Sequence, residues 1–346
     1  MTDIHIRIDG RAGRITLTRP EAMNALTWEM CLAIERALDA WRADQAVDLI
    51  VIDAAPGRAF CAGGDIVEMH RAGVEGRYDY GQRFWRDEYR MNAKLFHFPK
   101  PVVTFLHGFT MGGGVGVGCH ASHRIVDDTS QIAMPECAIG LVPDVGGTLL
   151  LARAPGRLGE YLGTTGARMG PGDAIHAGFA DLYVPNDWPA LIDALCETGD
   201  ATLADAAGQT PPGSEMARMQ ADIDTLFAGE TLGDIARAVD GARTPAAEAA
   251  RSALTRNAPL SMACTVEMLH RLGDDPTIEA ALSLEYRFTH RALELADFVE
   301  GIRAQIIDRD RSPRWRHTGP TAVPAVDVAR MLAPLPKGTP QPEIAQ

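Results

Sequence analysis

The sequence lacks the patterns that identify several common classes of protein. Its 346 residues carry a net charge of −13, whereas phosphate recognition normally relies on a basic surface, so a nucleic-acid-binding protein is not expected. The same charge argues against an anionic membrane surface as partner, although it leaves room for a local basic patch that meets an anionic cofactor. The apolar runs VDLIVIDAA and PVVTFLHGF are too short to span a bilayer.

Motifs built on cysteine, on a nucleophilic serine or on a phosphate-binding lysine are missing as well. The six cysteines form no CxxC pair and no metal-like cluster, and no secretory signal precedes them. We therefore expect reduced, mostly buried thiols in a soluble, cytoplasmic protein. Neither a GxSxG elbow nor a Walker loop occurs.

The order of the predicted elements is typical of an α/β protein. Apolar and polar residues alternate around Asp9-Gly10, which indicates a hairpin, and Thr27 is a suitable N-cap for the amphipathic helix that follows. Residues 49–55 and 101–109 are apolar enough to be buried strands, and a glycine-rich loop follows each. The recurring strand, loop and helix predict an α/β or spiral β/α architecture.

Composition divides the chain into three predicted regions. Residues 1–186 form the α/β core, in which residues 123–136 predict a further short strand pair. Residues 187–317 are predicted to be mainly helical. Residues 318–346 contain six prolines, so we expect an extended tail there.

Two acidic residues occupy the segment MPECAIGLVPDVGG at 134–147. Glu136 and Asp144 have apolar or backbone-permissive neighbours, and an acid in such surroundings is disfavoured as an anion unless something pairs with it. Two such acids on one site supply a base, a nucleophile or a proton donor. The alternatives are ordinary: Asp144 before Val-Gly-Gly fits a turn, and Glu136 fits a helix cap or a surface acid.

The second glycine-rich loop has three interpretations. It contains Gly112, Gly113, Gly114, Gly116 and Gly118. A match to the dinucleotide fingerprint GxGxxA begins inside the predicted helix instead of at the strand end, and lacks the later acid, which disfavours it. Tight helix packing is the second interpretation. We favour the third, close approach of the backbone to a ligand, because Gly63-Gly64 forms a similar loop, and opposed N–H groups would make an oxyanion hole for an ester or thioester carbonyl.

Three histidines near this loop are weaker candidates. His120 and His123 lie three residues apart on a predicted helix, but no third ligand is evident, so a metal site is not expected. His107 ends a predicted strand just before the glycines and fits a hydrogen-bonding scaffold role.

Four segments together resemble the crotonase, or enoyl-CoA hydratase/isomerase, superfamily. They are RPEAMNAL (19–26), AFCAGGDI (59–66), HGFTMGGGVG (107–116) and MPECAIGLVPDVGG (134–147). The likeness continues through 165–181. It is strongest to the branch that hydrolyses 3-hydroxyisobutyryl-CoA, through GFTMGGGVG, PDVGG and residues 285–315. Residues 187–250 show little that matches.

The resemblance implies a ββα spiral core with a C-terminal helical region, and an acyl-CoA substrate. It implies an oxyanion hole made by the backbone N–H groups of Gly64 and Gly113, with Glu136 as the catalytic glutamate and Asp144 as the second acid of the hydrolases. Residues that match the loops lining the coenzyme A channel are Asn24, Ala25, Leu26, Ala62, Asp65 and Ile66. No metal is implied, and no cofactor beyond the coenzyme A of the substrate; a homo-oligomer, trimeric or hexameric, stays open.

The chain departs from the hydratase pattern at one position. Hydratases of this superfamily carry a second glutamate just after the glycine run, and here that position is Gly116. We therefore predict hydrolysis of a short 3-hydroxyacyl-CoA instead of hydration. A hydratase or isomerase that uses Glu136 alone, and a non-catalytic acyl-CoA-binding protein, are the alternatives.

Overall fold

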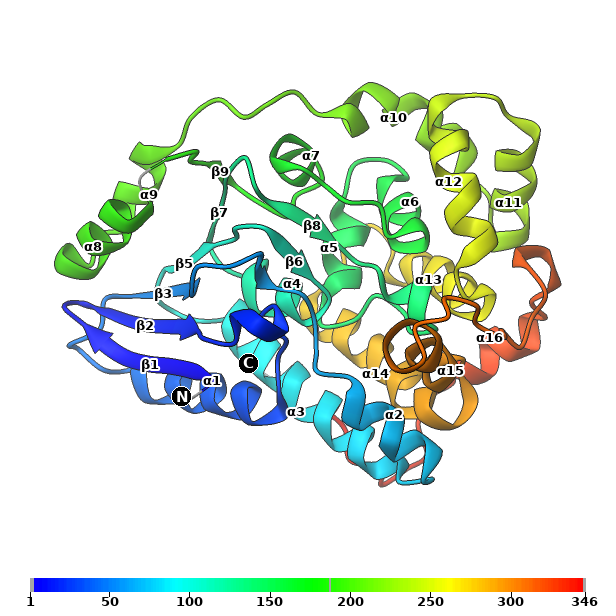
Figure 1. Cartoon of the computed structure of the whole chain (residues 1–346), viewed down its shortest axis with the longest axis horizontal. Helices are drawn as coiled ribbons and strands as arrows, with labels where there is room; N and C mark the ends of the chain where they lie inside the picture. The colour runs from blue at the N-terminus through cyan, green and yellow to red at the C-terminus, as the bar shows by residue number, and fades with distance from the viewer. Residues whose placement is uncertain (1–2, 187, 345–346) are drawn as a thin grey trace.

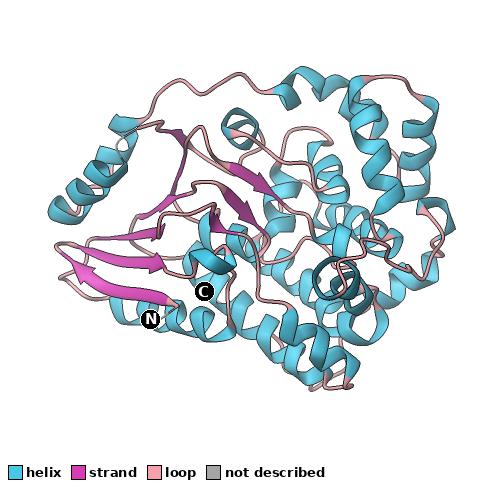
Figure 2. Cartoon of the chain, viewed as in Figure 1, coloured by secondary structure: helices cyan, strands magenta, loops and turns pink. Residues whose placement is uncertain are grey.

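The computed structural model describes residues 3–186 and 188–344 (Figure 1). Residue 187, where the sequence predicts the helical region to begin, and the last two residues of the predicted tail lie outside the described residues. Helices surround and extend away from two small sheets (Figure 2). The α/β class is therefore confirmed.

The strands of the described residues form two sheets. The larger has the order β1-β2-β3-β5-β7-β9 and the smaller the order β4-β6-β8, and β1 and β2 are the antiparallel neighbours expected for a hairpin, while the other pairs are parallel. The strands are β1 (Ile4–Asp9), β2 (Ala12–Leu17), β3 (Leu49–Ala54), β4 (Ala59–Cys61), β5 (Val102–Phe105), β6 (Phe109–Met111), β7 (His123–Val126), β8 (Gln131–Ala133) and β9 (Leu182–Tyr183).

The predicted strand pair over 123–136 is wrong in one respect. Both strands exist, as β7 and β8, but they do not pair with each other. A turn over 127–130 sends the chain from one sheet to the other, so that β7 extends the sheet after β5 while β8 extends the sheet after β6. Each pair of consecutive strands from β3 to β8 thus adds one strand to each sheet. This is the spiral that the resemblance implies.

The helices up to residue 176 fill the turns of this spiral. They are η1 (Pro20–Ala22), α1 (Trp28–Trp41), α2 (Val67–Val74), α3 (Tyr78–Phe96), α4 (Gly113–Gly118), η2 (Glu136–Ile139), α5 (Gly147–Arg153), α6 (Leu158–Thr165) and α7 (Pro171–His176). Thr27 caps α1 as expected, accepting a hydrogen bond from the N–H of Met30 at 3.2 Å.

Helices also dominate the rest of the chain. They are α8 (Trp188–Thr198), α9 (Thr202–Ala207), α10 (Glu215–Leu226), α11 (Leu232–Gly241), α12 (Pro245–Arg256), α13 (Pro259–Leu272), α14 (Ile278–Leu295), α15 (Phe298–Ile302), the π-helical turn η3 (Arg303–Ile307), η4 (Pro320–Ala322) and α16 (Ala325–Met331). No helix of the described residues has the length and apolar character that crossing a membrane requires.

Helices α8 and α9 pack with the α/β core. Ile192 and Leu195 of α8, with Ala204 of α9, join one buried cluster with the outward-facing side chains of the larger sheet, among them Val51 and Val103. The two helices lie beside that sheet in Figure 1, and a long connection separates them from α10. The first part of the unmatched region 187–250 therefore closes the second apolar face of the sheet.

The predicted extended tail contains a helix instead. Helix α16 lies within it, and Met331 and Leu332 at its end are buried. Prolines did not prevent this helix because Pro324 precedes its first turn, where a missing N–H costs no hydrogen bond.

The C-terminal helices fold back over the spiral. Helix α14 packs along α3, α13 packs against α5 and α6, and α15 packs against α2 and η2. Segments far apart in the sequence thus meet around η2, which begins at Glu136.

Candidate active site

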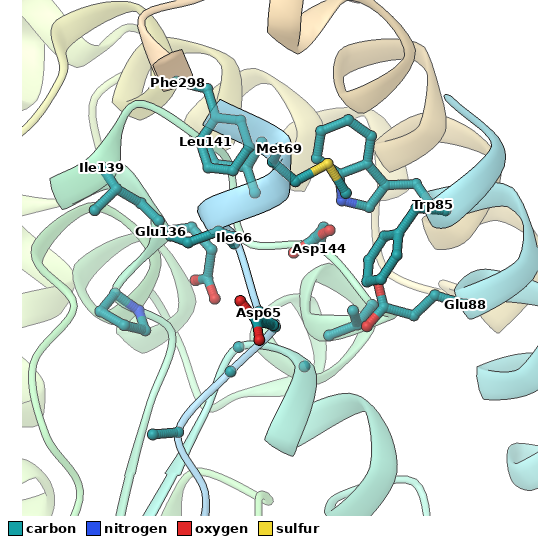
Figure 3. Close-up of a pocket in the computed structure, with 18 residues that line it drawn as sticks. Asp65, Ile66, Met69, Trp85, Glu88, Glu136, Ile139, Leu141, Asp144 and Phe298 are labelled. Atoms are coloured by element: carbon teal, nitrogen blue, oxygen red, sulfur yellow. The ribbon is translucent and has the colours of Figure 1, made fainter. Parts of the chain in front are cut away.

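A cavity of about 110 Å³ lies where the two glycine loops, η2, α3 and α15 meet (Figure 3). Its lining residues are Ala62, Gly63, Gly64, Asp65, Ile66, Met69, Phe84, Trp85, Glu88, Gly112, Gly113, Pro135, Glu136, Ile139, Leu141, Asp144, Val145 and Phe298. Both predicted acids and both predicted oxyanion-hole glycines are in this set. The cavity joins carboxyl groups with backbone N–H groups inside an otherwise apolar wall.

The glycine loops lie against each other. A Cβ atom on Gly113 would come within 3.3 Å of the backbone nitrogen of Gly64. Within the described residues, neither of these two N–H groups has a hydrogen-bond partner. The φ angles of Gly63 and Gly112, 120° and 50°, are ones that glycine adopts readily and other residues rarely do. Two N–H groups are therefore available to one ligand oxygen.

Glu136 lies beside the second of these loops. It is the first residue of η2 and is 4% exposed. Its Oε1 faces Gly112, where a Cβ atom would be only 2.8 Å away, and its Oε2 has no hydrogen-bond partner among the described residues. Burial, and secondarily the nearby Asp144 carboxyl, raise the pKa of Glu136 well above its ordinary value. A raised pKa makes the ionised carboxylate a stronger base than an ordinary glutamate.

Asp144 is both a turn residue and part of the cavity wall. Its Oδ2 accepts a hydrogen bond from the Tyr89 hydroxyl at 2.7 Å. Burial raises the pKa of Asp144 to about 7, and the Tyr89 hydrogen bond opposes part of that rise. The next two residues, Val145 and Gly146, have φ angles of 55° and 78°. Such angles are rare for a β-branched residue, so Asp144 begins a strained segment.

A third acid faces the cavity, and the sequence argument missed it. Glu88 of α3 is 3% exposed and has no hydrogen-bond or ion-pair partner within the described residues. Burial raises its pKa well above the ordinary value, and the charges of Asp144 and Glu285 add to the effect. Helical spacing could have revealed it, because Trp85, Glu88 and Asn92 follow one another at steps of three and four on the buried face of α3.

The residues predicted to line the coenzyme A channel divide into two groups. Ala62, Asp65 and Ile66 line the cavity. The segment 24–26 does not, but it holds the first glycine loop, since the N–H of Leu26 donates to the Gly63 carbonyl at 2.9 Å.

Asn24 and Ala25, which precede Leu26, stabilise the turn over residues 19–26. Asn24 is fully buried and bonds to the N–H of Arg19 and to the Ala59 carbonyl, and the Ala25 carbonyl accepts a hydrogen bond from Arg19. The hydrogen bonds of Asn24 therefore stabilise the turn. Contact between this segment and coenzyme A stays a prediction.

Gly116 has no room for a side chain. A Cβ atom there would lie 2.7 Å from Nδ2 of Asn92 and 2.8 Å from Cβ of Val145. Gly118 is packed just as closely, with Leu106 at 2.6 Å. Tight packing therefore explains these two glycines of α4, whereas Gly112 and Gly113 face the cavity.

The histidines have structural partners. Burial lowers the pKa of His120 to about 4, so its ring is neutral, and its Nε2 is 2.8 Å from the carbonyl oxygen of Val145. His123 is 2.9 Å from the Ser122 hydroxyl. His107 packs edge-on against Trp188, but its buried Nε2 has no hydrogen-bond partner among the described residues, which goes against the hydrogen-bonding role predicted for it.

Comparison with known proteins agrees with this geometry. The family model for enoyl-CoA hydratase/isomerase matches residues 12–332, and the chain belongs to that family. Both levels of the predicted resemblance are confirmed, because human mitochondrial 3-hydroxyisobutyryl-CoA hydrolase is 34% identical over 319 residues, 89% of this chain and 82% of that protein. The chain is accordingly an enzyme of this family.

Solved structures show the same fold over nearly the whole chain. An enoyl-CoA hydratase from Rhodobacter sphaeroides is 60% identical with a TM-score of 0.93, covering 96% of this chain and 98% of its own. A carnitinyl-CoA dehydratase from Mycobacterium thermoresistibile is 39% identical with a TM-score of 0.92, covering 97% of each chain. The crotonase fold predicted from the sequence is confirmed.

Proposed function

We propose that this enzyme hydrolyses the coenzyme A thioester of a short 3-hydroxyacyl group, with 3-hydroxyisobutyryl-CoA as the leading candidate. One observation carries the proposal: Glu136, Asp144 and the N–H groups of Gly64 and Gly113 meet at one small cavity, while the position of the second glutamate of hydratases is Gly116, which has no room for a side chain. The relatives named for this hydrolase support the same reaction.

In the proposed reaction the thioester oxygen lies between the N–H groups of Gly64 and Gly113. These donors stabilise the negative charge that develops on that oxygen, and losing one such donor typically costs about 2.7–4 kcal/mol of transition-state stabilisation. Glu136 then acts in one of two ways, as general base or as nucleophile.

As general base, Glu136 takes a proton from water while the water oxygen attacks the carbonyl carbon. The C–S bond breaks, and the thiolate receives that proton. As nucleophile, the Glu136 carboxylate attacks and expels the thiolate; water then hydrolyses the resulting anhydride, which frees the Glu136 carboxylate and the acyl acid and supplies the proton that the thiolate takes up. Hydrolysis in ¹⁸O-labelled water under single-turnover conditions distinguishes the two, because the anhydride route can place the label in Glu136.

The remaining acids fit recognition of the substrate hydroxyl. Asp144 and Glu88 face the cavity from two different elements, a turn and a long helix (Figure 3). A buried carboxyl accepts a hydrogen bond from a hydroxyl group readily, and an acyl group without that hydroxyl would leave the carboxyl unpaired. This gives the site a reason to prefer 3-hydroxyacyl over plain acyl thioesters.

The size of the cavity fits a short acyl group. An engineered protein cavity of about 150 Å³ binds benzene, and this one measures about 110 Å³. Trp85 and Phe298 form part of its wall, with ring centroids 5.8 Å apart. A group of a few carbon atoms fits.

A hydratase or isomerase is the second candidate, because the Rhodobacter sphaeroides structure at 60% identity carries the name enoyl-CoA hydratase. A panel of acyl-CoA thioesters separates the two. Thiol release from 3-hydroxyisobutyryl-CoA supports the proposal. Loss of conjugated absorbance from crotonyl-CoA without thiol release supports hydration, and tight binding without either signal supports a non-catalytic acyl-CoA-binding protein.

Two further expectations stay predictions. The word mitochondrial in the names of the relatives describes the location of those proteins. For this chain, the sequence still predicts a cytoplasmic location. A trimer or hexamer is likewise untested, and light scattering of the purified protein measures it.

A further inference from the structure

A buried acid on a C-terminal helix contacts the turn that carries Asp144. Glu285 of α14 is fully buried. Its Oε2 accepts a hydrogen bond from the N–H of Gly146 at 2.8 Å, and its Oε1 accepts bonds from the N–H and the hydroxyl of Thr148 at 3.0 and 2.5 Å. The described residues supply no cation to it. Its carboxyl is therefore committed to the backbone two to four residues after Asp144.

That backbone is held in a conformation that it would not adopt alone. Val145 has a φ angle of 55°, and strain of this kind persists only where surrounding structure over-determines it. His120 bonds to the Val145 carbonyl from one side, at 2.8 Å, while Glu285 holds the following residues from the other. Together they fix the direction in which Asp144 leaves the turn.

The same helix also reaches the Asp144 side chain. Thr289 lies one turn after Glu285, and its Oγ1 is 3.3 Å from the Tyr89 hydroxyl that donates to Asp144. Helix α14 thus contacts both the backbone after Asp144 and the hydrogen-bond donor of its carboxyl.

We propose that Glu285 is a positioning residue that orients Asp144 through the backbone of Val145–Thr148. The carboxyl suits this task because two buried N–H groups and a hydroxyl need acceptors, and an apolar side chain would leave them unpaired. The kinetic part of the proposal rests on the proposed hydrolase function. The competing explanation is that Glu285 only stabilises the start of α5, since Gly146 and Thr148 are at its first turn.

The substitution Glu285→Gln separates these explanations. Glutamine keeps the size but places an amide N–H₂ against one of the backbone donors, so the turn must shift. We expect kcat for the 3-hydroxyacyl thioester to fall about 100-fold, the loss typical of a misplaced reacting group, while KM changes little because the binding loops stay in place. Glu160→Gln is the matched control, because Glu160 is a buried acid that does not line this cavity.

A measurement that needs no turnover accompanies the kinetics. The ¹³C carboxyl resonance of Asp144, assigned through Asp144→Asn, should move in Glu285→Gln and stay in place in Glu160→Gln. A folded Glu285→Gln protein with unchanged kcat and an unmoved Asp144 resonance overturns the proposal. If the wild type releases no thiol from any thioester but the resonance moves, the hydrolase function fails while the positioning role stands.

A second pair of variants covers the case in which Glu285→Gln does not fold. Thr148→Val removes the hydroxyl that bonds to Glu285, and Thr148→Ser keeps it. We expect a lowered kcat and a displaced Asp144 resonance in the valine variant, with both restored in the serine variant. Wild-type values for both quantities in Thr148→Val would contradict the proposal.

Discussion

The α/β core and the C-terminal helices contribute to the cavity in different ways. The core supplies the groups proposed to meet the thioester, namely Gly64, Gly113, Glu136 and Asp144, which lie in its loops or at the first residue of a short helix. Helices α14 and α15 supply Glu285, which holds the turn after Asp144, and Phe298, which closes the wall. The comparison teaches that the reactive groups all lie within residues 64–144, whereas part of what holds and encloses them comes from helices more than 100 residues further along the chain.

The two regions share one electrostatic environment. Glu88, Glu136 and Asp144 from the core and Glu285 from α14 are all buried, and burial raises the pKa of each. No ion pair compensates these four carboxyls within the described residues. Their charges therefore disfavour one another, and the predictions that follow test the core and the helices separately.

The largest effect is expected for Glu136→Gln in the core. The amide can neither accept the proton of water nor attack the carbonyl, so thioester cleavage should fall by roughly 10³-fold or more, within the range for loss of a general base. Calorimetry should find binding of coenzyme A nearly unchanged, because the channel residues stay in place. Turnover at the wild-type rate would remove Glu136 from the mechanism.

Asp144→Asn should reduce cleavage of 3-hydroxyacyl thioesters by roughly 100-fold, and that of plain acyl thioesters less. A site that bonds to a substrate hydroxyl discriminates strongly against groups that lack it. Rates of thiol release from matched pairs of thioesters measure the difference. Equal losses on both members of each pair would assign Asp144 a role in proton transfer.

Gly116→Ala tests the packing between α4 and the strained turn. The added Cβ would meet Asn92 and Val145, and overpacking of this kind typically costs about 1–3 kcal/mol of stability. The midpoint temperature of thermal unfolding and kcat should both fall. Gly170→Ala is the control, because a Cβ there meets open space within 4 Å. A Gly116→Ala protein that matches the control would show that Val145 can move without consequence.

The buried acid of the C-terminal helices should make stability depend on pH. Burial raises the pKa of Glu285 from 4.5 to about 8, so its stabilising contribution is complete below about pH 4.5 and is lost as the pH rises toward 8. Between pH 6.5 and 8 this amounts to roughly 1–2 kcal/mol. The free energy of unfolding, measured by chemical unfolding at the two pH values, should decline less with rising pH for Glu285→Gln than for the wild type. Identical declines would mean that Glu285 does not titrate in this range.

The smallest effect is expected for Phe298→Leu, which enlarges the cavity on the side where α15 forms its wall. The preference for short over longer acyl groups, measured as a ratio of kcat/KM values, should fall by no more than about tenfold, the low end of what one methylene group contributes. An unchanged ratio would place the end of the acyl group away from α15.

Much of the site was predictable from the sequence because its functional residues lie in short continuous segments. Glu136 and Asp144 lie in one segment, and Gly63-Gly64 and Gly112-Gly113 each follow an apolar strand. The hairpin and the Thr27 cap were predictable for the same reason, since local hydrogen bonds and alternation specify them. The strand pair over 123–136 was mispredicted because short strands do not show which sheet they join.

The sequence by itself determined the family, the spiral core and the acids and glycines that meet at the cavity. Only the tertiary structure decided that Glu88 faces that cavity, that Gly116 has no room for a second acid, and that Glu285 holds the turn after Asp144. The physical reason is range. Turns, caps and strands depend on neighbours in the chain, whereas the burial of a carboxyl and the partners it finds depend on which distant helix packs above it.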